Sequence, residues 1–266
     1  MTLNYQTVDN LTGVPTYSIL EFKTKNKKFA LVIPVINESY RIIEQLRKIE
    51  HINPEIDIII ADGGSTDESS VFFQNGNHNL RTLLTMKSYG RLSSQMRMAF
   101  HYCAGQGYEA VIAMDGNDKD SPEGIKLIAR ALEEGFDFVQ GSRFHKDGVA
   151  LNTPVARYLA IRFIHAPLTS LAAGRWFTDT TNGFRGYRIK ALQHKDISIF
   201  RDIFVGYELL AYLPIRISKI GYKVCEVPVS RIYPDSKKVP TKIHGIRSQL
   251  QILGILLKSC FGGFNP

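Results

Sequence analysis

FALVIPVINESYRIIEQLRKIEHINPEIDIIIADGGSTD, residues 29–67, contains two short apolar runs separated by a longer segment of helical period. Phe29–Ile33 and Asp57–Ala61 are rich in β-branched residues, and Ser39–Ile49 repeats its apolar residues every three or four positions. This pattern predicts two buried strands joined by a helix, the repeating unit of a parallel sheet.

The same alternation continues on the C-terminal side of this unit. Further strands are predicted at Arg81–Thr85, Ala110–Met114 and Asp137–Gln140, and further helices at Ser65–Asn75, Leu92–Gly105 and Pro122–Glu134. The sequence therefore predicts an α/β fold with a mostly parallel central sheet flanked by helices. In such folds ligands bind at the carboxyl ends of the strands.

Composition narrows the class of protein. The 266 residues are 44% hydrophobic and 22% charged, which is globular, and the formal charge of +8 favours anionic partners: nucleotides, nucleic acid or an acidic membrane surface. The three cysteines form no CxxC or Cys/His cluster, so neither a disulfide framework nor a structural zinc site is expected. A reducing, cytoplasmic compartment fits this cysteine usage.

The N-terminal segment lacks the pattern of the rest. Residues 1–27 are polar and aperiodic, without the basic flank and apolar run of a signal peptide, and are expected to form an arm ahead of a fold that starts near Lys28. No later run approaches the ~20 apolar residues of a membrane span. We expect the protein to remain in the cytosol.

Polar residues follow three of the predicted strands. They are Pro34-Val35-Ile36-Asn37-Glu38, Asp62-Gly63-Gly64-Ser65-Thr66-Asp67 and Asp115-Gly116-Asn117-Asp118-Lys119-Asp120. The glycines after Asp62 allow close approach of a ligand, and Ser65 is placed to cap the next helix, whose amides attract anions. The alternative is a plain glycine turn with a helix cap.

The segment at Asp115 has two interpretations as well. Its side-chain oxygens suit a hard divalent cation beside a diphosphate, or they form a turn rich in Asp and Asn. No GxGxxG follows a strand and no GxxxxGK[ST] is present, so dinucleotide and P-loop chemistry are excluded.

An ordered series of motifs carries a family resemblance. The chain resembles the inverting glycosyltransferases of family 2, most closely the dolichol- or polyprenyl-phosphate sugar transferases, from about Lys28 to about Pro240. The motifs are IPVINE (33–38), ADGGSTD (61–67), MDGNDKDSPE (114–123), GSRF (141–144), DTTNGFRGYR (179–188) and GYKVCEVPV (221–229).

The resemblance implies a GT-A fold, a nucleotide-diphosphate sugar donor, and Mg²⁺ or Mn²⁺ at the diphosphate. It assigns to the nucleotide sugar Pro34, Asn37, Glu38, Asp62, Asp115 and Gly116, and to the metal Asp115 and Asn117. Two positions depart from the family, since Asn117 replaces an aspartate and Gly63 replaces an acid. Losing a carboxylate weakens a Mg²⁺ site unless Asp118 or Asp120 turns inward.

The second half is assigned by the resemblance to the acceptor. Arg143, with Arg157 or Arg162, matches positions that meet an acceptor phosphate, which guanidinium groups bind through a fixed fork of donors. An ordinary solvated helix face is the alternative for Arg157 and Arg162. Asp179 matches a position facing the reacting sugar and would serve as base for a hydroxyl acceptor. For a lipid phosphate it would orient the sugar or acceptor instead, and the remaining alternative is a cap of the Gly183 turn.

Later motifs each have a functional and a structural interpretation. Glu208 and Glu226 match family positions, with closure of the sheet against the acceptor side as the structural alternative. Lys237 and Lys238 lie in a segment that resembles a basic loop over the diphosphate, where cations would stabilise the leaving group; a plain surface loop is the alternative.

The predicted domains are an arm (1–27), a GT-A domain (28–240) and a C-terminal amphipathic helical tail (241–266). The tail places Ile246, Leu250, Leu253, Leu257 and Phe261 at helical spacing, amid basic residues. It is expected either to lie in a membrane interface or to pack on its own domain or a second subunit. Any membrane association would be peripheral, at the cytoplasmic face.

The sequence thus predicts a metal-dependent inverting glycosyltransferase. It would move a sugar from a UDP- or GDP-sugar to a polyprenyl or dolichyl phosphate or to a growing cell-surface glycan. The alternatives are a nucleotide-sugar-binding protein that has lost turnover and a sugar nucleotidyltransferase, which would need a Gly-rich basic loop where IPVINE stands. Nucleic acid is not expected as a partner, and a homo-oligomer is left open.

Overall fold

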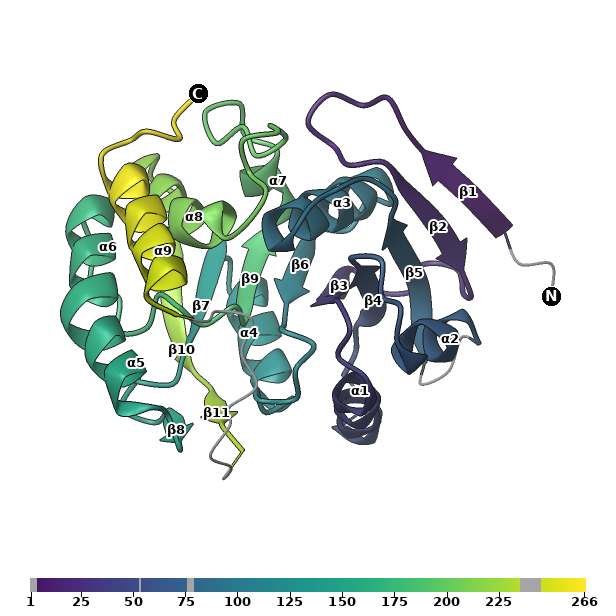
Figure 1. Ribbon diagram of the computed structural model, residues 1–266, viewed down its shortest axis with the longest axis horizontal. Coiled ribbons are helices and arrows are strands. Elements are labelled where there is room, and N and C mark those ends of the chain that lie inside the picture. The colour runs from purple at the N-terminus through teal and green to yellow at the C-terminus, as the bar shows by residue number, and fades with distance from the viewer. Residues whose placement is uncertain (1–3, 53, 76–78, 235–244) are drawn as a thin grey trace.

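A nine-stranded mixed sheet forms the centre of the molecule in the computed structural model, which describes residues 4–52, 54–75, 79–234 and 245–266 (Figure 1). Its strands, in spatial order, are β1 (Asn4–Val8), β2 (Tyr17–Glu21), β5 (Leu80–Met86), β4 (Asp57–Asp62), β3 (Phe29–Val35), β6 (Ala110–Ala113), β9 (Arg185–Arg188), β7 (Phe138–Ser142) and β10 (Val224–Pro228). A small second sheet pairs β8 (Val149–Leu151) with β11 (Ser230–Ile232).

Helices cover both faces of the large sheet. On one face α1 (Tyr40–Ile52), α2 (Glu68–Gln74) and α4 (Gly124–Glu133) bury their apolar sides, and on the other face lie α3 (Leu92–Gly105), α7 (Ile189–Leu192) and α8 (Glu208–Lys219). A continuous helical run follows β8, made of α5 (Val155–Ala160), the π-helical turn η1 (Ile161–His165) and α6 (Ala166–Ala173). The last helix, α9 (Gly245–Cys260), packs against α6 and α8.

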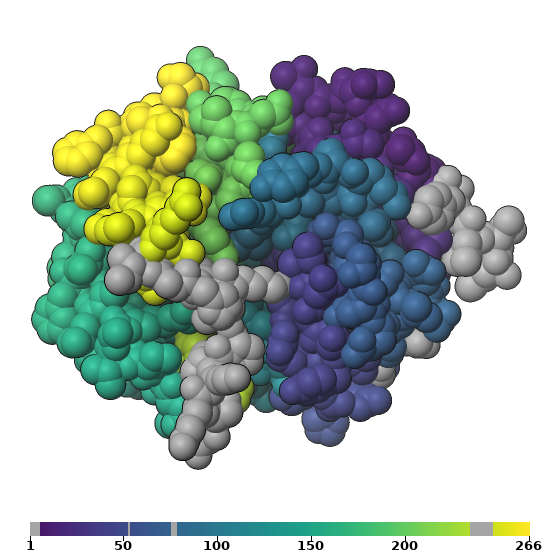
Figure 2. Space-filling model, viewed as in Figure 1, coloured from purple at the N-terminus to yellow at the C-terminus, as the bar shows by residue number. Residues whose placement is uncertain are grey.

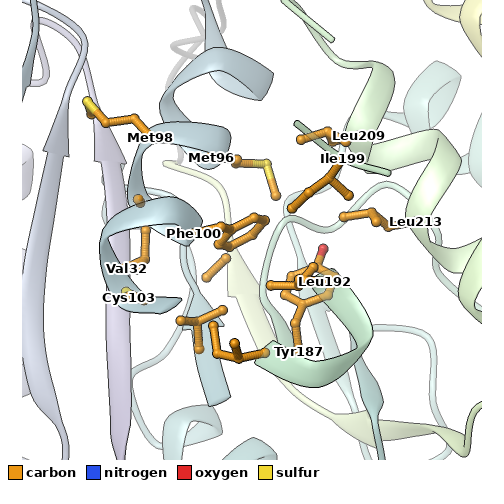
Figure 3. Close-up of a cluster of buried hydrophobic side chains, with 14 of the residues drawn as sticks. Val32, Met96, Met98, Phe100, Cys103, Tyr187, Leu192, Ile199, Leu209 and Leu213 are labelled. Atoms are coloured by element: carbon orange, nitrogen blue, oxygen red, sulfur yellow. The ribbon is translucent and has the colours of Figure 1, made fainter. Parts of the chain in front are cut away.

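Phe100 of α3 lies at the centre of one core cluster (Figure 3). Its ring meets Tyr187 of β9 edge-on, with 5.5 Å between the ring centroids. Leu209 and Leu213 of α8 are buried in the same cluster. Burying large apolar side chains stabilises the fold by roughly 1.5–3 kcal/mol each, so this cluster fixes α3 and α8 against the sheet.

The predicted α/β architecture is confirmed. The predicted Leu92–Gly105 helix is found with those bounds, and the predicted strands lie within two residues of β3 to β7. The sheet is less parallel than expected, because β9 runs antiparallel between β6 and β7 and because β2 pairs antiparallel with β5. Alternating β-rich and helical segments reveal neighbouring parallel strands but not an antiparallel strand inserted from a distant part of the chain.

Residues 4–21 differ from the expected arm. β1 and β2 extend the sheet beyond β5, and Tyr17 and Leu20 are buried beneath helices and strands of the core. Tyr17 also shares a hydrogen bond with the imidazole of His101 on α3, 3.0 Å away. The organised fold therefore begins well before Lys28, with β1 as the edge strand of the sheet and β2 buried beside it.

The reversed direction of β9 positions the functional edge. Its residues pair with β6 from Ala110↔Arg188 to Ala113↔Arg185, so β9 starts where β6 ends. Residues 179–184, which precede β9, consequently lie at the same edge of the sheet as the residues that follow β3, β4 and β6. This edge is called the rim below. Within the described ranges no helix is both long and apolar enough to span a membrane.

Candidate functional site

The first part of the rim is formed by the loops after β3 and β4, which are tied together by side chains. The backbone amide of Asn37 donates to Ser65 Oγ over 3.0 Å, and Asn37 Oδ1 accepts from the amide of Thr66 over 2.8 Å. Ser65 in turn donates to Asp62 Oδ1 over 2.6 Å. Three residues expected near the nucleotide or its pocket thus lie side by side.

The sequence suggested that Ser65 caps the following helix, but in the structure it does not. α2 begins at Glu68 with Asp67 at its N-cap position, and Ser65 is instead bound to Asp62. Asp67 accepts hydrogen bonds from the amide and hydroxyl of Ser39, which link it to the first loop. The small polar residues of this segment join the two loops, so α2 begins later than predicted.

Asp62 is an acid held in a mostly buried position. Burial raises the pKa of its carboxyl, although hydrogen bonds from Ser65 and Gly64 oppose that rise. Beside it, a Cβ atom at Gly63 would come within 2.7 Å of Gln95 Nε2, which donates to the carbonyls of Val35 and Ala61. Gly63 therefore leaves room for a side chain that locks β3 to β4, which explains why no acid stands there.

Asp115 and Asn117 form the second part of the rim, just beyond β6. Gln45 of α1 holds their loop by donating to the carbonyl of Asp115 and accepting from the amide of Asp118. Gly116 packs directly on β3, since a Cβ there would approach Val35 within 2.5 Å. Its role in the structure is this close packing under the loop.

The side chains of Asp115 and Asn117 lie next to each other and leave one oxygen atom without a partner. Asn117 donates from Nδ2 to Asp115 Oδ2 over 3.4 Å, and Asn117 Oδ1 is buried with no hydrogen-bond partner. A hollow of about 10 Å³ is lined by Asp115, Gly183, Pro34 and neighbouring apolar side chains. An unpartnered amide oxygen beside a carboxylate is a donor set that fits Mg²⁺ or Mn²⁺.

The two other aspartates of this loop do not supply a replacement ligand. Asp118 forms an ion pair with Lys48 of α1, with 2.7 Å between the charged atoms. Asp120 is fully buried and paired with Arg231; burial raises the pKa of its carboxyl, and Arg231 opposes that rise. Among the residues that the structure describes, no group of three or more Asp, Glu, His or Cys gathers as a metal site.

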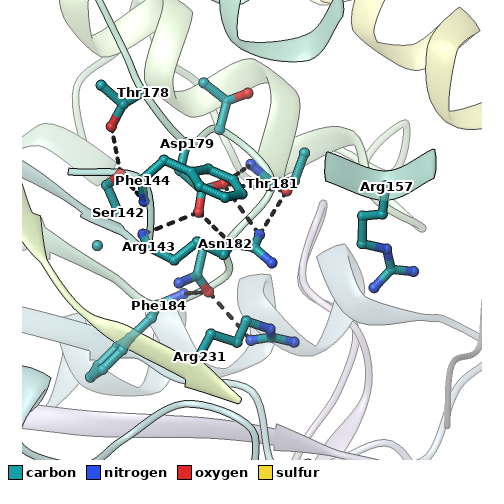
Figure 4. A network of polar contacts seen from close by, with 12 residues as sticks. Ser142, Arg143, Phe144, Arg157, Thr178, Asp179, Thr181, Asn182, Phe184 and Arg231 are labelled. Carbon is teal, nitrogen blue, oxygen red and sulfur yellow. Dashed lines mark hydrogen bonds and ion pairs between the residues drawn. The ribbon is translucent and has the colours of Figure 1, made fainter. Parts of the chain in front are cut away.

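Arg231 is the central cation of the rim. From β11 its guanidinium contacts Asp120, lies 3.2 Å from Asp115 Oδ2, and points at Asn182 of the loop before β9 (Figure 4). It thereby connects the end of β6, the loop before β9 and the small sheet. A Cβ at Gly183 would lie 2.6 Å from Asp115 Oδ1, so glycine is required for that loop to approach the carboxylate.

Arg143 and Asp179 form a second acid–arginine pair, which is closed to solvent. Arg143 Nε donates to Asp179 Oδ2 over 2.6 Å, and the two side chains are 2% and 0% exposed. Burial raises the pKa of Asp179, but the charge and hydrogen bonds of Arg143 outweigh it and leave the pKa below its usual value. Asp179 also accepts from Thr181 (Figure 4). A buried carboxylate in this state is poorly suited to accept a proton from a nucleophile.

Tyr233 lies where the predicted acceptor arginines converge. Its hydroxyl accepts from Arg143 NH1 over 3.2 Å and from Arg157 NH1 over 3.0 Å. Arg157 therefore reaches from α5 into the site, in contrast to a solvated helix face. Arg162 lies over the ring of Phe144, 5.8 Å from its centroid, and is further from this centre.

The remaining expected residues have structural contacts or lie outside the described residues. Glu226 of β10 accepts from the amide and hydroxyl of Thr178 over 2.9 Å, and Glu208 accepts from the amide of Gly206. Glu38 is buried and paired with Arg41. Lys237 and Lys238 fall in residues 235–244, which the structure does not describe.

Arg231 and Tyr233 were not singled out by the sequence, although the segment with Lys237 and Lys238 that follows them was. The available signal was an arginine and an aromatic residue just after the last family motif, GYKVCEVPV (221–229). The partners of Arg231 lie 111 and 116 residues earlier in the chain, and a single sequence does not reveal such pairs.

The sheet and its rim define the class of protein: a nucleotide-sugar transferase with the GT-A fold. The family model described as "Glycosyl transferase family 2" matches residues 30–194, and the chain belongs to this family of glycosyltransferases. Similar curated proteins are a polyprenol monophosphomannose synthase of Mycolicibacterium smegmatis and an undecaprenyl-phosphate mannosyltransferase of Micrococcus luteus. Each is 24% identical over 75% of this chain, covering 76% and 81% of the relative respectively.

A solved structure supports the fold independently. Glucosyl-3-phosphoglycerate synthase of Mycobacterium tuberculosis, crystallised with Mn²⁺, UDP and glucosyl-3-phosphoglycerate, superimposes with a TM-score of 0.63. The match covers 89% of this chain and 81% of the other, at 14% identity. At that identity the likeness establishes the GT-A architecture, and the substrates have to be inferred from the site itself.

Proposed function

We propose that this glycosyltransferase moves a sugar, with inversion, from a nucleotide-diphosphate sugar to a polyprenyl phosphate. The observation that carries the proposal is the convergence of Arg143, Arg157 and Arg231 around Tyr233, with Arg231 also beside Asp115 at one edge of the sheet. Guanidinium groups bind phosphate oxygens through paired donors, and three of them beside a carboxylate suit two phosphate-bearing substrates. The names of the two curated relatives support this acceptor class.

The donor would bind on the Asp115 side of the rim. Pro34 and Asp62 lie there at the ends of β3 and β4, and Asn37 lies on the loop after β3. Asp115 and Asn117 offer the oxygen atoms that would hold Mg²⁺ or Mn²⁺. When bound, such an ion would supply positive charge beside the diphosphate. Both uridine and guanosine donors fit this description, and the structure of the pocket does not select between them.

The acceptor side favours a phosphate over a sugar hydroxyl. A hydroxyl nucleophile needs a base, and Asp179, the candidate for that role, is buried against Arg143 with a lowered pKa. A lipid phosphate is already anionic and needs orientation instead of deprotonation. Arg157 is the partly exposed cation of the cluster and would meet that phosphate first, while Asp179 fixes Arg143 behind it.

A transfer assay tests the proposal. Purified protein is incubated with detergent-dispersed undecaprenyl phosphate and radiolabelled UDP-glucose or GDP-mannose, with Mn²⁺, Mg²⁺ or EDTA, and labelled lipid is extracted. We expect a labelled lipid product with one of the two donors and its loss with EDTA. Arg157→Ala should raise KM for the lipid at least ~10-fold, since charge-assisted contacts are worth ~1.5–3 kcal/mol. Arg130→Ala, at an exposed position of α4, is the matched control.

Two outcomes would contradict the proposal. Nucleotide binding without labelled lipid would instead support a donor-binding protein that has lost turnover. Labelled lipid with equal KM in the two variants would remove Arg157 from the acceptor site.

A further inference from the structure

The helical run of α5, η1 and α6 carries an unusual outer surface. Val155, Phe163 and Leu171 are 73%, 71% and 83% exposed, and Trp176 just after the run is 67% exposed. The inward side of the same run is buried, through Ile161, Ala166, Thr169, Ser170 and Ala173. Exposed apolar side chains scattered singly are normal, whereas several large ones along one helical run indicate a surface that meets another apolar phase.

Helix α9 continues this surface. It packs against α6, with the thiol of Cys260 near the carbonyl of Leu168, and in Figures 1 and 2 the two helices lie together on one side of the molecule. Leu250 is 62% exposed and Phe261 is 87% exposed, while Leu256 is buried against the domain. The tail thus packs on its own domain, as one of the two expectations had it, and still presents apolar residues outward. Its place in a membrane interface stays a prediction.

The charge of these helical segments indicates which kind of surface they contact. The chain holds 25 acidic residues in 266, yet residues 148–178 and 236–266 contain none, while Arg157, Arg162, Arg175, Arg247 and Lys258 are among their cations. Helical segments that are rich in exposed apolar residues and cations and free of carboxylates have the composition of helices that lie in the surface of an anionic bilayer. A second copy of this chain, with the same positive charge, would repel such a face.

We propose that the outer face of α5, η1, α6 and α9 docks onto an anionic lipid bilayer. Trp176 is exposed just after α6, and tryptophan is enriched at the level of lipid head groups. Arg157 projects from the same helical run to Tyr233, on the side toward the rim. Docking would therefore bring a lipid phosphate next to Arg157, and this last point rests on the proposed function.

The single tryptophan of the chain makes docking directly measurable. Vesicles of phosphatidylcholine, with or without about one third phosphatidylglycerol, are titrated into the full-length protein while Trp176 emission is recorded. We expect a blue shift with the anionic vesicles, quenching by brominated lipid, and weakening by salt. Phe163→Asp and Leu171→Asp should each reduce vesicle affinity at least ~10-fold. Val71→Asp, at a 64% exposed position of α2, is the matched control and should change it little.

Failure of the docking inference is distinguishable from failure of the proposed function. The vesicles contain neither nucleotide sugar nor polyprenyl phosphate, and transfer is measured separately with a short-chain, water-soluble polyprenyl phosphate. Absence of vesicle binding, or equal losses in Phe163→Asp and Val71→Asp, would overturn docking whatever the transfer result. Sedimentation showing a dimer that Phe163→Asp dissociates would overturn it as well, because the face would then bind a second copy.

Discussion

Two acid–arginine pairs stand on the same rim and differ in their access to solvent. Arg143 and Asp179 are 2% and 0% exposed, whereas Arg231 and Asp115 are 7% and 27% exposed. The two charges of the first pair neutralise each other, and Asp179 also binds Thr181 in the loop before β9. The second leaves Asp115 beside an unpartnered oxygen of Asn117 and open to a ligand. Residue type and rim position therefore do not distinguish a closed ion pair from an open one, and burial does.

Breaking the closed pair should have the largest effect on stability. Asp179→Asn leaves the Arg143 guanidinium buried without a counter-charge, which typically costs ~3–5 kcal/mol of unfolding free energy. Urea unfolding followed by circular dichroism measures this loss. Asp115→Asn is the matched variant and should lose less than ~1 kcal/mol, because its pair is partly exposed. Equal losses in the two variants would erase the distinction between the pairs.

For activity we expect the opposite ranking: replacing Asp115 should have a larger effect than replacing Asp179. Asp115→Asn is expected to lower kcat about 100-fold or more, since it removes a charge from the position proposed to organise the donor diphosphate. The measurement is transfer under saturating acceptor, with a thermal-shift titration of UDP and GDP in parallel. A variant that keeps both metal-dependent nucleotide binding and transfer would place the donor elsewhere.

Asn117 offers a way to sharpen the open pair. Asn117→Asp adds a carboxylate beside Asp115, and affinity of hard-cation sites rises with the number of charged ligands, so Mn²⁺ should bind about tenfold more tightly. Electron paramagnetic resonance of free Mn²⁺ reports the affinity without any enzymatic turnover. Asn265→Asp, at the exposed C-terminal end, adds the same charge away from the rim and should leave the affinity unchanged.

The smallest expected effect concerns Tyr233, which lies between the two pairs. Burial raises the pKa of its phenol, but Arg231, Arg143 and Arg157 outweigh burial and bring it to about 8. Because the pKa is lowered in the folded state, the phenolate adds stability fully above pH 10, and this contribution disappears as the pH falls through 8. Ultraviolet difference absorbance should show one tyrosine titrating near pH 8. Tyr233→Phe should lack it, and an unchanged titration would place the cations elsewhere.

Much of the first half could be predicted from sequence because its determinants are local. Strand and helix periods between Phe29 and Gln140 identify neighbouring elements, and parallel topology places the residues after β3, β4 and β6 at one edge. Asn37, Asp62 and Asp115 are accordingly found there. The reason for Gly63 stayed hidden, since it depends on Gln95, a side chain from another element.

The second half resisted prediction because its determinants are pairings between distant residues. The motif at Asp179 indicated a functional carboxylate, but its burial depends on Arg143, 36 residues earlier. The importance of Arg231 depends on Asp115 and Asp120, more than a hundred residues away. β1 and β2 were missed for the same reason, since β2 pairs with the distant strand β5 and β1 pairs with β2.

The long span between Arg231 and its acidic partners also has a consequence for synthesis. Proteins are made from the N-terminus, and domains begin to fold as they emerge from the ribosome. The strands of the donor half are complete 111 residues before Arg231 is added, so the nascent chain carries Asp120 without the cation that neutralises it. The rim is therefore assembled last, and a chain that stops short of β11 would keep its central strands and lack a finished site.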